Sequence, residues 1–129
     1  METNNNIQKT LFRVIIAGKR SFNDYDTLRD VCDNILADKC LTHKIVIVSG
    51  GTDGADTLGE RYAQERGYGL QRFPADWQQY GRAAGPIRNR QMADNADALI
   101  AFWDGESKGT KNMIETARRI GLMERIIMI

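Results

Sequence analysis

Short blocks of aliphatic and β-branched residues alternate along this chain with segments of helical periodicity. Most of the blocks are continuously apolar, which is typical of strands buried on both faces. Repeated alternation of strand and helix predicts a parallel sheet covered by helices. We therefore expect an α/β fold, a Rossmann-like three-layer α/β/α sandwich with a mainly parallel sheet of about five strands. The expected strands are residues 11–17, 45–48, 70–73, 98–103 and 125–129.

Residues that favour helix ends separate the expected strands. Asn23 or Asp24 can cap the first helix, and Pro86 suits the first turn of the third. Gly67 and Gly121 stand where glycine commonly closes a helix. The expected helices run from about 24 to 36, 55 to 66, 86 to 93 and 110 to 120, and residues 75–85 are turn-rich.

The composition indicates one ordinary globular domain. The chain has 129 residues, of which 42% are hydrophobic and 27% charged, and its formal net charge is +1. This length buries a core without cross-links, so we expect a single domain over residues 11–129 behind a flexible N-terminal arm over residues 1–10. The near-neutral charge disfavours a general polyanion binder, although clustered arginines still allow local anion binding.

The rare residue types exclude several kinds of site. Cys32 and Cys40 are the two cysteines, and no apolar run reaches the length of a signal-peptide core or a membrane span. We therefore expect a cytoplasmic protein without membrane association. His43 is the single histidine and falls in an expected surface loop, so neither a zinc site nor a Ser-His-Asp triad is expected. No cofactor is required, although magnesium can accompany a phosphate ligand.

Glycine-rich and polar segments follow three of the expected strands. In an open parallel sheet, ligands bind at the carboxyl ends of the strands, so these segments should meet there. Glycine lets a phosphate approach the backbone closely, and helix N-termini favour its negative charge. The candidate ligand-binding residues in these segments are Gly18, Arg20, Ser49, Gly50, Gly51, Gly54, Ala55, Asp56, Asp104, Gly105, Ser107, Gly109 and Thr110.

Simpler structural roles compete with ligand binding at several of these positions. The glycines after the second strand are equally suited to a tight turn. Asp56 either caps a helix or binds a ribose hydroxyl, and Thr110 is equally a helix cap. Trp77, Tyr80 and Trp103 are able to stack on a base, but packing roles are more common for such aromatic residues.

Arg88 and Asn89 complete the candidate ligand-binding set. Arginine suits phosphate because its guanidinium group donates hydrogen bonds from a rigid fork. Arg88 and Arg90 are two positions apart on an expected helix, so their side chains point in different directions. At least one of the two arginines should therefore be a surface charge.

Several motifs follow one another along the chain: VSGGTDGAD at 48–56, ERYA at 60–63, FPADW at 73–77, YGRAAGPIRNRQMA at 80–93, and DALIAFWDG at 97–105 with GT at 109–110. Together they resemble the SLOG superfamily, specifically its YspA-like branch, from about Val14 to Met128. The resemblance implies a domain that binds a nucleotide or a nucleotide derivative of the NAD or ADP-ribose type, as a ligand sensor or a sequestering protein. Relatives of this fold often pair through helices, so we expect a homodimer, with the neighbourhood of Met113 and Met123 as a candidate surface.

The superfamily also includes phosphoribohydrolases that cleave an N-glycosidic bond with the glutamate of a PGGxGTxxE motif. The glycine and threonine of that motif match here, but Met113 stands at the glutamate position. Glu115 should point away from the pocket, because it lies two residues further along the helix. Glu60 and Asp104 are the candidate catalytic residues if the chain hydrolyses nucleoside monophosphates.

A third alternative comes from the DNA-processing members of the superfamily, which bind single-stranded DNA. Residues 88–90 are similar to their Arg-Asn-Arg motif. DNA binding depends on many cationic contacts with phosphates, so the near-neutral charge disfavours DNA as the main ligand.

Overall fold

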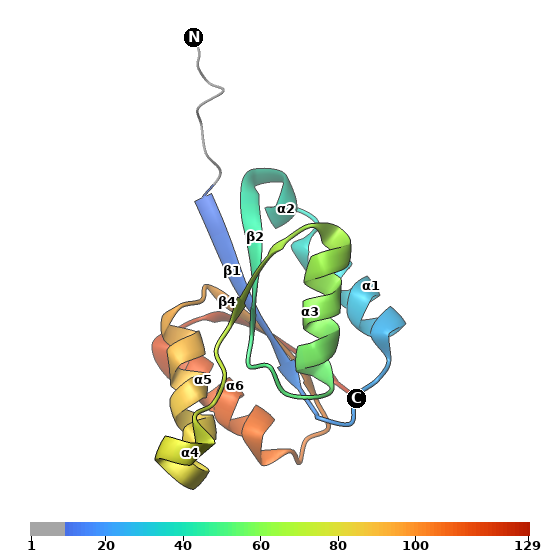
Figure 1. Cartoon of the computed structure of the whole chain (residues 1–129). Helices are drawn as coiled ribbons and strands as arrows, with labels where there is room; N and C mark the ends of the chain where they lie inside the picture. Colours follow the sequence, from blue (N-terminus) through green and yellow to red (C-terminus); the bar gives the residue numbers. More distant parts are fainter. Residues whose placement is uncertain (1–9) are drawn as a thin grey trace.

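The computed structural model describes residues 10–129 (Figure 1). Residues 1–9, and with them all but the last residue of the expected N-terminal arm, lie outside the described part of the chain. Thr10 is the first residue of strand β1.

Five parallel strands form one sheet in the order β3-β2-β1-β4-β5. They are β1 (Thr10–Gly18), β2 (His43–Ser49), β3 (Gly69–Arg72), β4 (Ala98–Trp103) and β5 (Met123–Met128). The expected Rossmann-like α/β fold is confirmed. The strand order runs outward from β1 to β3, then resumes on the other side of β1 at β4. The boundary between β1 and β4 is therefore the switch point at which such sheets bind ligands.

Two helical layers cover the sheet, as the expected sandwich requires. Helices α1 (Tyr25–Leu36) and α3 (Ala55–Arg66) pack on one face. Helices α5 (Ala84–Asp94) and α6 (Lys108–Ile120) pack on the other face (Figure 1).

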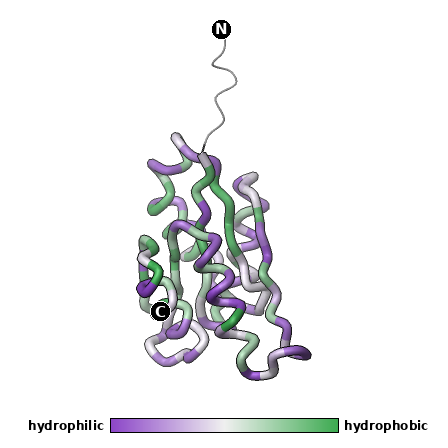
Figure 2. Tube along the Cα trace, turned by 90° about the vertical axis from the view of Figure 1, so that its left-hand side faces the viewer, coloured by the Kyte–Doolittle hydropathy of each residue, from purple (hydrophilic) through white to green (hydrophobic). Residues whose placement is uncertain are grey.

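The apolar strand blocks supply both cores. Along β1, Val14 and Ile16 belong to the core under α1 and α3, whereas Ile15 and Ala17 belong to the core under α5 and α6. Successive strand residues point to opposite faces, so a strand covered on both sides needs apolar residues at every position. The coloured trace shows this hydrophobic interior and the polar loops around it (Figure 2).

Most expected helix ends are confirmed. Asp24 caps α1 by accepting a hydrogen bond from the Thr27 amide at 3.1 Å. Gly67 and Gly121 close α3 and α6 in the left-handed conformation. The start of α6 differs from the expectation: the helix begins at Lys108, and the residue before it stands at the N-cap.

Two short segments were not expected. Helix α4 (Trp77–Tyr80) and the 3-10 turn η2 (Gly81–Ala83) occupy the turn-rich segment before α5. Helix α2 (Lys39–Thr42) leads directly into β2, so His43 begins a strand and does not lie in a surface loop. Its ring lies edge-on to Phe12, with the centroids 5.9 Å apart.

The structure bears on the expected dimer surface and on the expected absence of membrane association. Met113 is buried, so it cannot contribute to a dimer surface as expected, whereas Met123 is half exposed on the edge strand β5. Within residues 10–129, no helix combines the length and the apolar character needed to cross a membrane.

Candidate ligand-binding site

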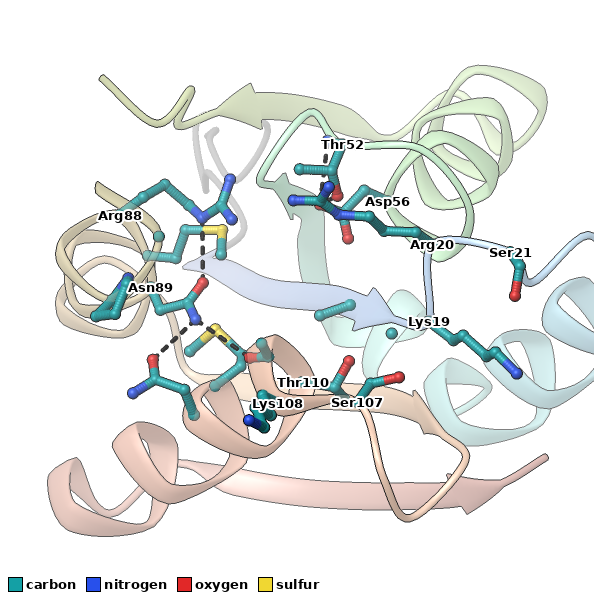
Figure 3. Close-up of a pocket in the computed structure, with 18 of the residues that line it drawn as sticks. Lys19, Arg20, Ser21, Thr52, Asp56, Arg88, Asn89, Ser107, Lys108 and Thr110 are labelled. Carbon is teal, nitrogen blue, oxygen red and sulfur yellow. Dashed lines mark hydrogen bonds between the residues drawn. The ribbon is translucent and has the colours of Figure 1, made fainter. Parts of the chain in front are cut away.

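A cavity of about 610 Å³ lies at the carboxyl end of β1, beside the switch point (Figure 3). It is lined by the end of β1, by the loops after β1, β2 and β4, and by α3, α4, α5 and α6. Of the expected ligand-binding residues, eight line it: Gly18, Arg20, Asp56, Arg88, Asn89, Ser107, Gly109 and Thr110.

The loop after β1 is hydrogen-bonded to the end of β4 and to the start of α3. The Lys19 amide donates to the Phe102 carbonyl at 3.1 Å, and the Lys19 carbonyl accepts from the Ala55 amide at 3.4 Å. A Cβ on Gly54, whose φ is +79°, would meet the Lys19 and Arg20 carbonyl oxygens. Gly54 therefore allows close contact between two loops, and it does not line the cavity itself.

Arg88 is the most deeply buried cation of the site, with 8% of its surface exposed. Its Nη1 donates to the Gly50 carbonyl at 2.7 Å, and its Nε donates to Asn89 Oδ1 at 3.1 Å. Within residues 10–129 its Nη2 has no partner. Burial lowers the pKa of Arg88, but an arginine remains protonated in proteins. A buried, partly unpaired guanidinium group favours a bound anion.

Asp56 is also buried, with 5% of its surface exposed. Its Oδ2 accepts hydrogen bonds from the Thr52 hydroxyl at 2.7 Å and from the Thr52 amide at 3.3 Å. Gly54 occupies the N-cap of α3, so Asp56 holds the preceding loop and is not the cap. Burial raises the pKa of the Asp56 carboxyl, and its Oδ1 has no partner in the described chain.

Asn89 joins α5 to α6. Its Nδ2 donates to Asn112 Oδ1 at 2.9 Å and to the Gly109 carbonyl at 3.4 Å. Because its Oδ1 accepts from Arg88, the side chain both orients the guanidinium group and fixes the start of α6 (Figure 3).

The N-terminus of α6 presents free backbone donors to the cavity. Ser107 makes no side-chain cap hydrogen bond. Among the described residues, the amides of Lys108, Gly109 and Thr110 have no hydrogen-bond partner, as is usual for the first turn of a helix. Thr110 is buried in this first turn, so its predicted role as the helix cap is wrong.

The cavity lining is cationic although the chain is almost neutral. Lys19, Arg20, Arg88 and Lys108 line it, and Asp56 is the one carboxylate among the lining residues. The positive end of the α6 dipole adds to this field. The cavity is therefore suited to an anion.

Seven of the expected ligand-binding residues do not line the cavity: Ser49, Gly50, Gly51, Gly54, Ala55, Asp104 and Gly105. Asp104 Oδ1 accepts from the Ser107 and Glu106 amides at 2.8 and 2.9 Å, and Oδ2 lies 3.5 Å from Lys19 Nζ. These amides, led by that of Ser107, lower the pKa of Asp104. Its carboxylate thus organises the loop before α6.

Glu60, the other candidate catalytic residue, also lies outside the lining. Its Oε2 accepts from the Ser49 hydroxyl at 2.7 Å, and its Oε1 accepts from Arg72 at 2.8 and 3.0 Å. The Arg72 guanidinium lowers the pKa of Glu60. Ser49 in turn accepts from the Gly51 amide at 3.0 Å, so Glu60 supports the glycine-rich loop after β2.

The prediction for the two neighbouring arginines is confirmed. Arg88 faces the cavity, whereas Arg90 is exposed and pairs with Asp94 at 3.0 Å. Glu115 is exposed on α6, and Met113 takes the place beside the cavity.

Sequence reasoning missed ten lining residues, and it named one more, Trp77, only as an aromatic residue able to stack on a base. Several follow helical spacing from residues it found, so a helical projection of 85–92 and 109–113 would have shown them. The ten missed residues are Ala17, Lys19, Ser21, Thr52, Gly85, Pro86, Met92, Lys108, Asn112 and Met113.

The fold and the site define a Rossmann-like α/β domain with a cationic cavity at the switch point of its sheet. Residues 12–80 match the YspA, cpYpsA-related SLOG family. The chain is also 34% identical over 118 residues to the gene 61 protein of Mycobacterium phage D29, covering 85% of this chain and 91% of that protein. The chain belongs to this SLOG family, as its motifs predicted.

Two solved structures share the fold. The X-ray structure of TM1055 superposes with a TM-score of 0.60 at 22% identity, over 91% of this chain and 72% of that one. The DNA processing protein A of Streptococcus pneumoniae superposes with a TM-score of 0.69 at 17% identity, over 91% of this chain. This chain spans half the length of the latter protein.

Proposed function

We propose that the cavity binds a phosphorylated nucleoside derivative, of the nucleotide, NAD or ADP-ribose type, and that the protein senses or sequesters this ligand. The observation that carries the proposal is the buried Arg88, whose Nη2 has no partner within residues 10–129. Nη2 is not among the fully buried unpaired side-chain atoms of the described residues, so it is accessible, and a phosphate oxygen beside it would accept a charge-assisted hydrogen bond.

The rest of the lining supports the same ligand class. The free amides at the start of α6 are suited to a second phosphate oxygen or a second phosphate group. Lys19 and Arg20 add charge from the loop after β1. The free Oδ1 of Asp56 is suited to accept a hydrogen bond from a sugar hydroxyl.

Magnesium can enter with such a ligand through its phosphates. The described residues contain no group of three or more histidine, cysteine or acidic side chains that could hold a metal ion. A magnesium ion here would therefore depend on the ligand's own oxygens, and its effect would appear as tighter binding of the nucleotide.

Calorimetric titration with a ligand panel tests the proposal. We expect saturable binding of ADP, ADP-ribose or NAD⁺, with inorganic phosphate binding more weakly at the same cavity. The matched control is Arg90→Met, on the exposed face of the same helix, and the test variant is Arg88→Met. Loss of binding in both variants, or in neither, would contradict the assignment.

A hydrolytic activity is a second candidate, favoured by one observation. Asp56 is buried, its pKa is raised, and it is the one carboxylate among the lining residues. These properties suit a general acid or base. Glu60 and Asp104, in contrast, lie outside the lining and pair with Arg72 and Lys19. Chromatography of AMP incubated with the protein tests the candidate: it predicts released adenine, lost in Asp56→Asn.

A further inference from the structure

Trp77 is a large aromatic side chain left half exposed on the wall of the cavity. It is the first residue of α4, and 49% of its surface is exposed. Asp76 fixes the start of this short helix by accepting from the Gln79 amide at 3.0 Å. Within residues 10–129 the indole nitrogen of Trp77 makes no hydrogen bond, and the ring carbons of the side chain supply apolar surface to the cavity.

Apolar groups accompany Trp77 in the lining of the cavity. A Cβ on Gly85 would lie 3.5 Å from the Trp77 ring carbon Cη2, so the indole lies beside the first turn of α5. Pro86, Met92 and Met113 also line the cavity. The cations of the lining come from three elements: Lys19 and Arg20 from the loop after β1, Lys108 from the start of α6, and Arg88 from α5.

The cavity therefore suits a ligand with an anionic part and an apolar, planar part. For an indole side chain exposed beside such a cavity, contact with another aromatic ring is especially favourable in free energy. Bases stack on aromatic side chains without a requirement for particular hydrogen bonds.

We propose that Trp77 stacks on the planar heteroaromatic base of the phosphorylated ligand, so that this residue selects nucleotides over sugar phosphates. The inference rests on the proposed function of the cavity and adds the group that recognises the base. Trp103, the other tryptophan, has a different role: its Nε1 donates to the Ser107 carbonyl at 3.1 Å, and its ring packs against the core.

Two ligands that differ by the base test the inference. AMP and ribose 5-phosphate are titrated into the wild-type protein, Trp77→Ala and Trp77→Phe. We expect Trp77→Ala to weaken AMP binding about 10-fold or more, the range found when a stacking aromatic residue is removed. Trp77→Phe should retain most of the AMP affinity, and ribose 5-phosphate should bind all three proteins equally.

Fluorescence supplies an independent readout. AMP should change the tryptophan emission of the wild-type protein, and this change should be absent in Trp77→Phe, which keeps Trp103. A thermal melt of each variant establishes that it is folded, as expected for a half-exposed residue.

The possible failures are distinguishable. If the wild-type protein binds AMP and ribose 5-phosphate with equal affinity and Trp77→Ala binds both unchanged, the stacking inference is wrong and the proposed anion site stands. If Trp77→Ala weakens both ligands equally, the residue shapes the cavity and does not recognise the base. If the wild-type protein binds neither AMP nor the nucleotides of the panel above, the proposed function and the stacking inference fail together.

Discussion

The guanidinium group of Arg88 and the carboxylate of Asp56 both lie against the Cα atom of Gly50. A Cβ at that position would be 2.6 Å from Arg88 Nη1 and 2.8 Å from Asp56 Oδ2. The glycine is therefore required for two buried, oppositely charged side chains to reach the same part of the site. Gly50 acts through these side chains, since it does not line the cavity itself.

Replacing Gly50 by alanine should displace both charged side chains. The methyl group would occupy the space of Arg88 Nη1 and weaken its hydrogen bond to the Gly50 carbonyl. We expect nucleotide affinity to fall about 10-fold or more, roughly the loss of one charge-assisted hydrogen bond. Titration with ADP measures the effect.

Gly51→Ala is the matched control for this loop. Gly51 was expected at the ligand, but a Cβ there would meet no atom within 4 Å. Its φ of +75° makes alanine unfavourable by about 1–2 kcal/mol, so this variant should lose stability and keep its affinity. Equal loss of ADP affinity in Gly50→Ala and Gly51→Ala would show that Gly50 has no special role in positioning the charged side chains.

Lysine at position 88 should not replace arginine. A lysine has one charged nitrogen and cannot contact the Gly50 carbonyl, the Asn89 side chain and a phosphate with the geometry of a guanidinium fork. We expect Arg88→Lys to weaken ADP binding at least about 10-fold, while Arg90→Lys, on the solvent side, changes it little. Calorimetry on the two lysine variants checks this prediction. Wild-type ADP affinity in Arg88→Lys would show that the Arg88 guanidinium group does not bind the ligand.

Gly54→Ala should destabilise the protein far more than Gly51→Ala. Both glycines have positive φ, but a Cβ on Gly54 would also collide with the Lys19 and Arg20 carbonyl oxygens. We expect a loss of about 3 kcal/mol or more for Gly54→Ala, from strain and overpacking together. Urea unfolding of both variants measures the difference, and equal losses would show that the two loops separate easily.

The Glu60 carboxylate should stabilise the folded protein in a pH-dependent way. Its pKa is lowered in the folded state, chiefly by Arg72, so its contribution is present above the ordinary pKa of a glutamate. The contribution is lost as the pH falls through the lowered value. Glu60→Gln should therefore lower the free energy of unfolding by about 1 kcal/mol near neutral pH, and this loss should shrink as the pH falls below the ordinary pKa of a glutamate.

Urea unfolding over this pH range tests the prediction for Glu60. Glu115→Gln is the control, because Glu115 is an exposed glutamate without a partner in the described chain. If Glu60→Gln lowers the free energy of unfolding by the same amount at every pH, the hydrogen-bond geometry of Glu60 stabilises the protein and its charge does not.

The sheet was predictable because a strand buried on both faces needs a continuous run of apolar residues, which is visible in the sequence. Every residue of β1 from Val14 to Ala17 faces one of the two cores. The ends of the helices were predictable from their capping residues, Asp24, Gly67 and Gly121.

The site was only partly predictable, because much of it depends on contacts between distant segments. The need for glycine at position 54 arises from the backbone at 19 and 20, which no local pattern reveals. Trp77 lines the cavity because α4 lies against the first turn of α5, a result of tertiary packing. Glu60 was a catalytic candidate because it lies near the glycine-rich segments in the sequence, but its partners are Ser49 and Arg72.

The most direct test of the central claim is to identify what the cavity retains from a cellular small-molecule extract. Wild-type protein and Arg88→Met are incubated with the extract and washed, and the released compounds are identified by mass spectrometry. We predict that the wild-type protein enriches an intact phosphorylated nucleoside derivative that Arg88→Met does not. Equal enrichment by the two proteins, or a wild-type protein that retains no phosphorylated compound, would contradict the account.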